Sequence, residues 1–439
     1  MPELYQWQKD ALENWKRSNY IGVVEAVTGA GKTLVAHHAL VEHLEKNFDV
    51  LIIVPSAELQ KQWFRDIRRL KDSCENLIRN NYPIELLGGG NHDPGARIWR
   101  IKIAVVNSAI NRRFTPRNKE RALLIADECH HYGAPAFQRA LKQEYARRLG
   151  LTATYEREDD GIETYLSPYF KGVCFSLDYK RALAEDVIAK FKIAFVGIDL
   201  DANEREMYDD FADKCGYYKN KLLRAQPKLK EYSFGNFMRE ASRLSRTGDY
   251  LGIAARSYLS NFTGKRSLLA NSDNKYKCLS GLTEIIRQAE RTIIFSQTKK
   301  SAGRAIGLLR DNNLNADVLN SDMSDWQRQE ILADFESGET EVVAAPILLD
   351  EGINVPSADL AIILASSKTK RQMIQRMGRV LRKKPNNEIA KIIVMYAKNT
   401  SEDTKLGAHE DFMEEIKDAA MGVKTFESSD INNITDYLK

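Results

Sequence analysis

The residues from Ala26 to Thr33, with the sequence AVTGAGKT, constrain this chain more than any other stretch. They follow an apolar run at 21–24 that predicts a buried strand, and they precede a helical pattern from Leu34 to Leu44. A strand, a glycine-rich turn and a helix in this order form the context that a phosphate-binding loop requires. The chain is therefore predicted to bind a nucleoside triphosphate.

The residues of this loop have separate predicted roles. Gly29, Ala30 and Gly31 form the turn, where the glycines allow the backbone to approach a polyphosphate and to point several N–H groups inward. The dipole of the following helix adds positive charge at the same place. We expect Lys32 to reach the β- and γ-phosphates of ATP, and the Thr33 hydroxyl to ligate Mg²⁺.

A pair of acids follows another apolar run. The strand predicted at 122–126 ends at Asp127 and Glu128, about 95 residues beyond Lys32. An aspartate in this place can hold the Mg²⁺ that bridges the β- and γ-phosphates, and the adjacent carboxylate can orient and deprotonate the attacking water. Because the pair follows a buried strand and precedes a Cys-His dipeptide, we interpret it as catalytic rather than as a plain turn.

An amphipathic helix is predicted at the start of the chain, about 20 residues before the phosphate loop. A glutamine amide can donate to and accept from the adenine edge at the same time. We expect Gln8 to recognise adenine, with Trp7 or Tyr5 stacking on the base. The alternative is an ordinary solvent-facing glutamine on an amino-terminal helix.

Strands alternate with helices in the first part of the chain. Apolar runs without polar alternation lie at 21–24, 50–54, 101–106 and 122–126. Such runs are typical of strands covered on both faces of a parallel sheet, in a doubly wound α/β domain. Ligands of these domains bind at the carboxyl ends of the strands, where Lys32, Ser56, Ser108 and the acid pair fall.

Thr152 and Thr154 lie at the end of a further strand. Small hydroxyl residues there could relay the state of the phosphates to a second site through changed hydrogen bonds, although Thr-Ala-Thr in isolation indicates only a strand end. We assign both threonines, together with His130 of the Cys-His dipeptide, to this coupling.

The stretch 214–266 is rich in lysine and arginine and contains three acids, Glu231, Glu240 and Asp249. The net charge of the whole chain is only +4, so a nucleic-acid surface has to be local. Aromatic residues are interleaved with the basic ones, and cations with rings available for stacking are typical of a nucleic-acid surface. The alternative is a helical hairpin whose rings form its own core and whose lysines are only solvated. The basic candidates for contact with nucleic acid are Lys221, Arg224, Lys228 and Lys230.

A second α/β pattern starts near residue 273, and it has no phosphate loop. Its predicted strands lie at 292–295, 341–345, 360–364 and 389–396. If residues 372–382 are helical, Gln375, Arg379 and Arg382 lie on or near one face of that helix. Arginines in that arrangement suit a clamp on a γ-phosphate from across a cleft. A basic helix that contacts only DNA phosphates is the alternative.

Together these motifs resemble those of the superfamily two helicases and translocases, over nearly the whole chain. They are AVTGAGKT at 26–33, DECH at 127–130, TAT at 152–154, FSQT at 295–298, EGIN at 351–354 and QRMGRVLR at 375–382. Three features are similar to XPB helicases, particularly the short archaeal forms. They are a second histidine after DECH, the triplet Arg157-Glu158-Asp159 and the basic insertion.

The resemblance implies two tandem RecA-like domains with parallel sheets, at 1–170 and 171–439, and a helical thumb-like insertion at about 203–266 in the second. ATP would bind in the cleft between the domains. Arg379 and Arg382 would complete the catalytic site, Asn354 would contact the nucleotide, and Gln375 would take part in coupling.

The resemblance also implies ATP-driven translocation on DNA, or its opening, with 3′-to-5′ polarity, in DNA repair or transcription and with a nuclease as partner. DNA contacts would come from the insertion and from Ser56, Ser108, Ser296 and Arg157. Three alternatives stay open: an RNA-dependent ATPase or RNA helicase, an ATP-gated clamp that positions a nuclease, and a duplex translocase that does not separate strands.

The cysteines and the hydropathy indicate where the protein works. The five cysteines are scattered without a C-x-x-C pair, so neither a disulfide framework nor a zinc site is expected, and a reducing cytoplasm fits. No apolar run approaches the roughly 18 residues of a membrane span.

Overall fold

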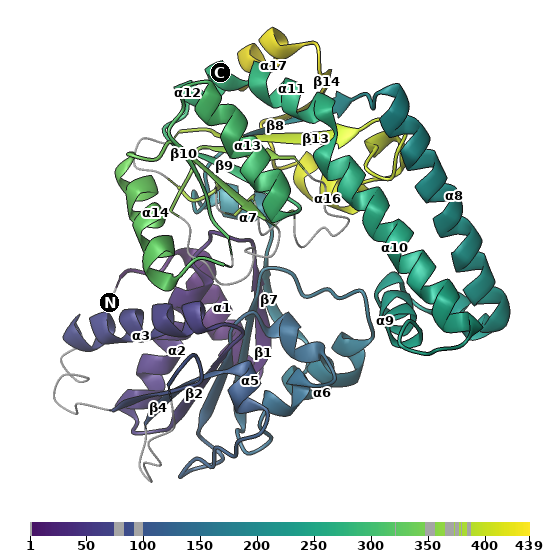
Figure 1. Ribbon diagram of the computed structural model, residues 1–439. Helices are drawn as coiled ribbons and strands as arrows, with labels where there is room; N and C mark the ends of the chain where they lie inside the picture. The colour runs from purple at the N-terminus through teal and green to yellow at the C-terminus, as the bar shows by residue number, and fades with distance from the viewer. Residues whose placement is uncertain are drawn as a thin grey trace. The chain divides into compact units, whose positions relative to one another are not determined.

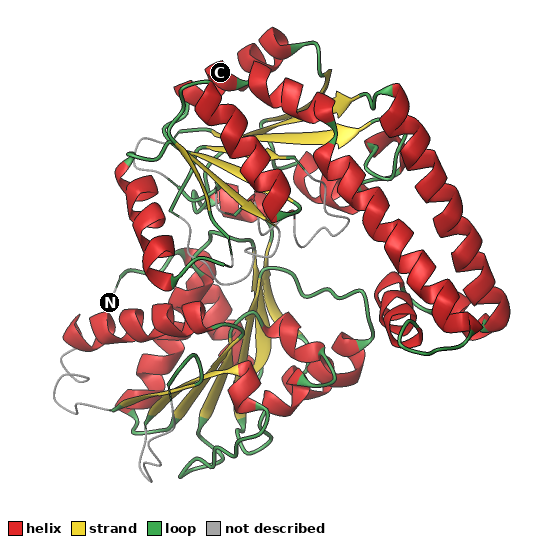
Figure 2. Ribbon diagram, viewed as in Figure 1, coloured by secondary structure: helices red, strands yellow, loops and turns green. Residues whose placement is uncertain are grey.

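The computed structural model describes residues 2–73, 83–91, 100–320, 322–346, 356–364, 373, 377–378, 380–383 and 388–439. Two compact units follow each other along the chain, and the first ends at Ile188. Each unit contains a seven-stranded sheet with helices packed against it (Figure 1, Figure 2). The predicted fold class, tandem α/β domains with parallel sheets, is confirmed.

Every pair of neighbouring strands in the first unit is parallel, and their order across the sheet is β3-β4-β2-β5-β6-β1-β7. All residues of β2, β4 and β5 are buried, which explains why these strands lack polar alternation. Lys102 of β4 is the exception to their apolar composition, and it is paired with Glu85 at 3.0 Å. The strands are β1 (Ile21–Ala26), β2 (Val50–Val54), β3 (Ile84–Leu87), β4 (Ile101–Val105), β5 (Leu123–Ala126), β6 (Arg147–Thr152) and β7 (Val173–Leu177).

Helices flank this sheet and connect its strands. α1 buries Trp7, Ala11 and Trp15 along one face, at the spacing of successive helical turns. The helices are α1 (Gln6–Arg17), α2 (Lys32–Glu45), α3 (Ala57–Ser73), α5 (Val106–Ala109), α6 (Ser167–Phe170) and α7 (Tyr179–Ala184), with the short turns η1 (Cys129–Gly133), η2 (Phe137–Ala140) and η3 (Ile162–Leu166).

The sequence predicted a boundary between the units after residue 170. In the structure the boundary lies after Ile188. β7 pairs with β1 at the edge of the first sheet. α7 follows β7, and Arg181 of α7 forms an ion pair with Asp10 of α1. The change in pattern near residue 171 therefore marks the edge strand of the first sheet and not the start of the second unit.

The sheet of the second unit is also parallel, in the order β10-β11-β9-β12-β13-β8-β14. Its strands are β8 (Phe191–Ile198), β9 (Thr292–Ser296), β10 (Ala316–Val318), β11 (Val342–Pro346), β12 (Leu360–Ile363), β13 (Ala390–Ala397) and β14 (Gly422–Glu427). Its helices are α8 (Ala202–Ala225), α9 (Phe234–Leu244), α10 (Tyr250–Asn271), α11 (Asp273–Gly281), α12 (Thr283–Gln288), α13 (Lys299–Asp311), α14 (Asp325–Ser337), α16 (Glu410–Lys417) and α17 (Ile431–Leu438), with the turns η4 (Pro227–Glu231) and η6 (Thr404–Leu406).

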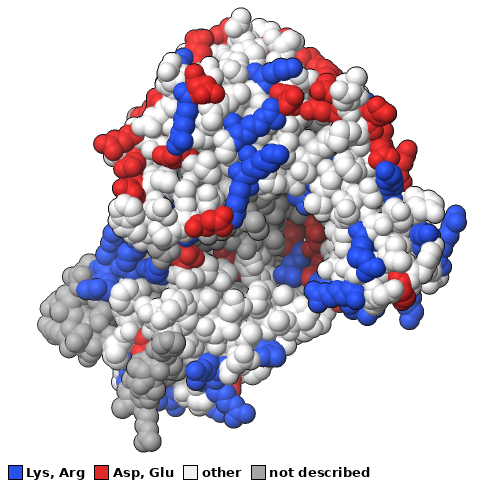
Figure 3. All heavy atoms as spheres, viewed as in Figure 1, with Lys and Arg blue, Asp and Glu red and all other residues white. Residues whose placement is uncertain are grey.

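The predicted insertion is a helical hairpin of α8 and α10, which extends from the second sheet and carries α9 at its far end (Figure 1). Asp201 and Asp249 cap the two long helices by accepting hydrogen bonds from Glu204 N–H and Gly252 N–H. Lys and Arg side chains gather at the far end of the hairpin, with few Asp or Glu among them (Figure 3). In the described part of the chain, neither these helices nor any other has the length and apolarity that a bilayer crossing needs.

Candidate functional site

The phosphate loop has the predicted structure of a turn between a strand and a helix. β1 ends at Ala26, and α2 begins at Lys32. Gly29 and Gly31 have φ angles of 84° and 88°, in the left-handed region that glycine adopts without strain. A Cβ at Gly31 would also lie 3.1 Å from Nε2 of Gln8, so both the backbone angle and the neighbouring side chain favour glycine there.

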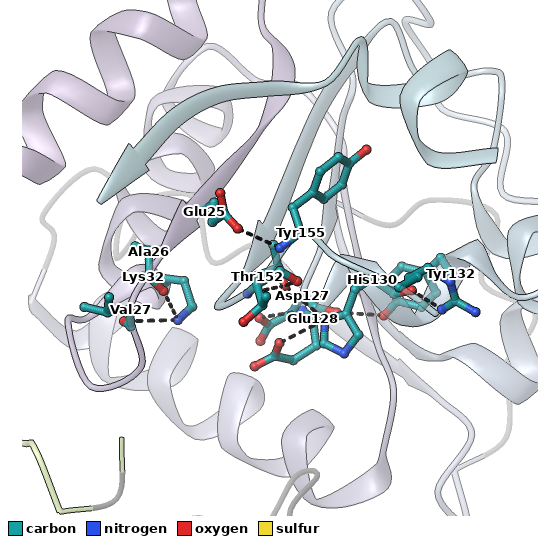
Figure 4. Close-up of polar contacts among 12 residues, drawn as sticks. Glu25, Ala26, Val27, Lys32, Asp127, Glu128, His130, Tyr132, Thr152 and Tyr155 are labelled. Carbon is teal, nitrogen blue, oxygen red and sulfur yellow. Dashed lines mark hydrogen bonds and ion pairs between the residues drawn. The ribbon is translucent and has the colours of Figure 1, made fainter. Parts of the chain in front are cut away.

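The Lys32 side chain folds back over this loop (Figure 4). Its Nζ donates to the carbonyl of Ala26 at 2.7 Å and to that of Val27 at 3.4 Å. Burial lowers the pKa of Lys32, and the negative charges of Glu128 and Asp127 oppose that shift. The lysine ammonium therefore faces the acid pair across the phosphate loop, as a nucleotide-binding lysine requires.

Asp127 follows β5 and is buried, with 7% of its surface exposed. Its Oδ2 accepts a hydrogen bond from Trp63 Nε1 at 2.7 Å, and its Oδ1 accepts one from the N–H of Glu128 at 3.0 Å. Burial raises the pKa of Asp127, while the hydrogen bond from Trp63 and the charge of Lys32 lower it. In the sequence, Trp63 is an aromatic residue on an amphipathic helix, a pattern that by itself indicates only a core position.

Glu128 adopts a left-handed backbone conformation, with φ 47° and ψ 52°. A non-glycine residue in this region is strained, and such strain persists where the surroundings hold it and is concentrated at functional sites. Glu128 Oε2 lies 3.5 Å from Nδ1 of the fully buried His130 (Figure 4). The strained backbone and the contact with His130 set the direction of the Glu128 carboxylate.

The three residues of the first unit that were assigned to coupling, His130, Thr152 and Thr154, are in direct contact. His130 Nδ1 lies 2.9 Å from the Thr152 hydroxyl. That hydroxyl donates to the carbonyl of Thr154 at 2.9 Å and accepts from the Thr154 N–H at 3.2 Å. All three side chains are buried. A continuous set of contacts thus runs from Glu128 through His130 to the Thr-Ala-Thr segment at the end of β6.

Arg157 does not have the free guanidinium that a DNA contact needs, so its prediction as a DNA-binding residue is corrected. Nε and Nη2 donate to the two carboxylate oxygens of Asp159 at 2.6 and 2.7 Å, and Nη1 donates to the carbonyl of His130 at 2.5 Å. Only 14% of the Arg157 side chain is exposed. It also packs against Gly133 and Gly161, where an added Cβ would clash with it. Arg157 therefore acts as an internal clamp, meaning that it ties the carbonyl of His130 in η1 to the carboxylate of Asp159.

The amino-terminal helix α1 contacts the phosphate loop through the side chain of Gln8. Gln8 is 1% exposed; its Nε2 donates to the carbonyl of Gly31 at 3.1 Å, and its Oε1 accepts from Tyr5 N–H at 2.9 Å. Both ends of the amide contact backbone, and adenine recognition by Gln8 stays a prediction. Stacking by Trp7 is wrong for this conformation, since its ring is fully buried against Phe175. Tyr5, the alternative, is 45% exposed.

The three predicted DNA-contacting serines lie at strand ends but differ in accessibility. Ser56 lies just after β2, and Ser108 lies in α5, just after β4. Because β2 and β4 are parallel neighbours, both half-buried serines lie at the carboxyl ends of the strands of the first sheet. Ser296 ends β9 and is fully buried, with its hydroxyl directed at the carbonyls of Thr298 and Ala345. The prediction for Ser296 is therefore wrong, because this side chain points into the protein.

Several residues predicted in the second unit lie outside the described residues: Asn354, Gln375 and Arg379. Arg382 is described and half-buried, and burial lowers the pKa of its guanidinium. The roles of these four residues stay predictions.

The aromatic residues of the hairpin divide into two sets, so each of the two interpretations accounts for part of them. Phe237, Tyr258 and Phe262 pack inside the hairpin as its core. Tyr217 and Tyr250 are 61% and 57% exposed. The ammonium of Lys221 lies 5.3 Å from the centroid of the first ring and 4.3 Å from that of the second. Arg224, Lys228 and Lys230 are exposed nearby in sequence. The hairpin thus has both its own core and an exposed surface of rings and cations.

Comparisons with known proteins agree with this geometry. Residues 1–157 match the family model described as "Type III restriction enzyme, res subunit", and residues 274–384 match the "Helicase conserved C-terminal domain". The chain is 30% identical to the DNA 3′-5′ translocase XPB2 of Sulfurisphaera tokodaii, over 91% of this chain and 83% of that protein. It is 24% identical to the DNA 3′-5′ helicase XPB of Kineococcus radiotolerans, over 92% of this chain but only 62% of the relative.

Solved structures share the fold at lower identity. S. cerevisiae Dbp5 bound to RNA and ADP BeF3 aligns with a TM-score of 0.63 at 12% identity, covering 99% of this chain and 93% of that one. The Pyrococcus furiosus Hef helicase domain aligns with a TM-score of 0.53 at 16% identity, covering 92% and 97%. With the motifs, the two parallel sheets and the archaeal relative in agreement, the chain belongs to the XPB-like DNA helicases of superfamily two, which are nucleic-acid-dependent ATPases.

Proposed function

We propose that this chain couples ATP hydrolysis to 3′-to-5′ movement along DNA. The observation that carries the proposal is the meeting of Lys32, Asp127 and Glu128 at the carboxyl edge of the first sheet, next to a strained loop and a buried histidine. Phosphoryl transfer needs a cationic cradle for the phosphates, a carboxylate for the metal ion and a second carboxylate for the attacking water. Each of these groups has a candidate here.

The donor set around Asp127 fits Mg²⁺. Each carboxylate oxygen accepts one N–H, which leaves further lone pairs, and the charge sits in a buried site beside Lys32. Hard oxygen donors are what Mg²⁺ prefers in proteins. Asp127 and the Thr33 hydroxyl would hold the ion, which when bound neutralises charge on the β- and γ-phosphates.

The remaining steps belong to the protein's own side chains. The N–H groups of residues 29–33 would hold the phosphates, and Lys32 would exchange its bond to the Ala26 carbonyl for one to a phosphate. Glu128 would orient the attacking water and accept its proton. His130, Thr152 and Thr154 would carry the change at Glu128 toward the DNA-binding edge of the sheet.

DNA would be held by two surfaces. Ser56 and Ser108 on the edge of the first sheet can donate to phosphate oxygens. Tyr217 and Tyr250 on the hairpin offer exposed rings for base stacking, with Lys221 between them for the phosphates. On the sequence motif alone, Arg379 and Arg382 are proposed to act on the γ-phosphate.

Steady-state ATP hydrolysis tests the proposal, measured without nucleic acid and with single-stranded DNA, duplex DNA, forked DNA and RNA. We expect stimulation by DNA and loss of turnover in Glu128→Gln, which keeps the size of the side chain but not its basicity. Stimulation by RNA alone would instead indicate an RNA-dependent ATPase. ATP binding without turnover on every substrate would indicate an ATP-gated clamp, and activity on duplex DNA without strand separation would indicate a duplex translocase.

The similarity to XPB proteins also supports a role in DNA repair or transcription and a nuclease as partner. The test is co-purification of the tagged chain with a nuclease from its source organism, followed by nuclease assays on forked DNA with and without this chain. A nuclease whose cleavage is unaffected by the chain and by ATP would contradict the partnership.

A further inference from the structure

Trp63 holds the carboxylate that is proposed to bind the metal ion, although it lies 64 residues away in sequence. Its indole Nε1 donates to Asp127 Oδ2 at 2.7 Å, a short distance for a hydrogen bond to a charged acceptor. Both side chains are buried, Trp63 at 1% and Asp127 at 7% exposure. Indole is a donor and never an acceptor, so the bond has one direction, from the Trp63 N–H to the Asp127 oxygen.

The ring of Trp63 is itself fixed by the helix that follows the phosphate loop. It packs edge-on against His37 of α2, with centroids 5.1 Å apart and planes at 88°. His37 lies one helical turn after Thr33, the other proposed metal ligand, and therefore on the same face of α2. The indole of Trp63 thus contacts both segments that carry the proposed metal ligands. Its N–H bonds to Asp127, and its ring packs against His37 on the helix that carries Thr33.

These contacts leave Asp127 with little rotational freedom. Oδ2 is held from α3 by Trp63, and Oδ1 is held by the backbone N–H of Glu128. Rotation about the Cβ–Cγ bond would break both hydrogen bonds in a site from which water is largely excluded. Leaving a buried charged acceptor without its donor costs more than an ordinary hydrogen bond is worth.

We propose that Trp63 is a positioning residue: its indole N–H fixes the Asp127 carboxylate in the orientation that binds the divalent cation accompanying ATP. The role rests on the proposed nucleotide site but adds a residue to it. Carboxylate ligands that are themselves hydrogen-bonded typically lose about 10–100-fold in metal affinity or activity when that supporting bond is removed. An indole that only filled the core would contribute to stability and not to the dependence on the metal ion.

Trp63→Phe keeps an aromatic ring against His37 and removes the N–H. Trp15→Phe is the matched control, because Trp15 is equally buried in the same unit and donates its Nε1 to the carbonyl of Arg148 at 2.9 Å, in a contact that does not involve Asp127. In both variants and the wild type, binding of a fluorescent ATP analogue is titrated with Mg²⁺, and once more with EDTA present.

We expect Trp63→Phe to need about 10–100-fold more Mg²⁺ for half-maximal enhancement of nucleotide binding. Binding in EDTA should equal that of the wild type, and Trp15→Phe should keep the wild-type Mg²⁺ dependence. A wild-type Mg²⁺ dependence in Trp63→Phe, or an equal shift in both variants, would overturn the role. A wild type that binds no nucleotide in the presence of Mg²⁺ would overturn the proposed function as well, which separates the two failures.

If Trp63→Phe does not fold by circular dichroism, the same titration is made with benzothienylalanine at position 63. This residue replaces the indole N–H with sulfur and keeps the shape of the ring, so it removes the hydrogen bond without a change in packing. The expected shift and the overturning result are the same.

Discussion

Replacing Arg157 distinguishes an internal clamp from a DNA contact. Arg157→Ala removes two hydrogen bonds to Asp159 and one to the carbonyl of His130, from a side chain that is 14% exposed. Breaking a largely buried ion pair by removing one partner costs about 3–5 kcal/mol. Gly161 N–H still donates to Asp159 at 3.1 Å, so we expect a loss near the lower end, about 3 kcal/mol.

The assay follows the unfolding of the first unit. For a unit of this size, a loss of about 1 kcal/mol in unfolding free energy lowers the thermal unfolding midpoint by roughly 2–4 °C. A loss of about 3 kcal/mol should therefore lower this midpoint by about 6–12 °C. Trp7, Trp15 and Trp63 are all buried in this unit, and their fluorescence reports its unfolding. Trp326 is 69% exposed on the second unit, and Trp326→Phe as the background removes its signal.

DNA binding at several salt concentrations provides the opposing result. If Arg157 contacted a DNA phosphate, Arg157→Ala would leave the unfolding midpoint unchanged. It would lower the slope of DNA affinity against salt concentration by about one ion. That outcome for Arg157→Ala would refute the clamp. Lys228→Ala, at a predicted phosphate contact on the hairpin, is the comparison variant for the DNA-binding result. Arg157→Lys should destabilise the first unit, because lysine cannot reproduce the two-point bond to Asp159.

Three more outcomes are expected. Tyr217→Ser and Tyr250→Ser should each weaken single-stranded DNA binding by about 1–3 kcal/mol in fluorescence titrations, with no change in unfolding midpoint because both rings are exposed. Thr152→Val should destabilise the first unit by about 1–3 kcal/mol in urea and lower the DNA stimulation of ATP hydrolysis, since it removes the hydroxyl that contacts buried His130. Burial lowers the pKa of His43 from 6.5 to about 4, so its contribution to stability is complete above pH 6.5 and is lost as the pH falls toward about 4. In urea unfolding, the wild type should lose roughly 3 kcal/mol more stability over this pH range than His43→Gln does.

The sequence predicted the elements whose residues carry a strong local pattern. β2, β4 and β5 are runs of mainly apolar residues that end at polar ones, and burial on both faces of a sheet requires that pattern. The phosphate loop has its own local pattern, two glycines directly before a Lys-Thr pair, between a strand and a helix. The edge strands β3 and β14 were missed, because an edge strand is short and half-exposed and its sequence is less distinct.

Side-chain direction at strand ends was the main source of error. Ser56 and Ser296 both end apolar runs, yet the first is half-buried and the second fully buried. Successive residues of a strand point to opposite faces, so a shift of one residue in the predicted strand end reverses the expected direction. Trp63 was missed because its partner Asp127 is distant in sequence and is recognised only from the three-dimensional contact. Arg157 was assigned wrongly because the sequence does not show that its guanidinium turns inward to Asp159 and to the carbonyl of His130.

The hydrogen bonds around Thr152 indicate which ring nitrogen of His130 carries a hydrogen. The hydroxyl of Thr152 has one hydrogen, which it donates to the carbonyl of Thr154. It therefore accepts from His130, and the hydrogen of His130 must lie on Nδ1. The same Nδ1 faces Glu128 at 3.5 Å, a longer distance than its 2.9 Å bond to Thr152. If Glu128 activates water as proposed, we expect a small movement of its side chain to transfer this bond from the threonine to the carboxylate, so that the Thr-Ala-Thr segment loses a restraint.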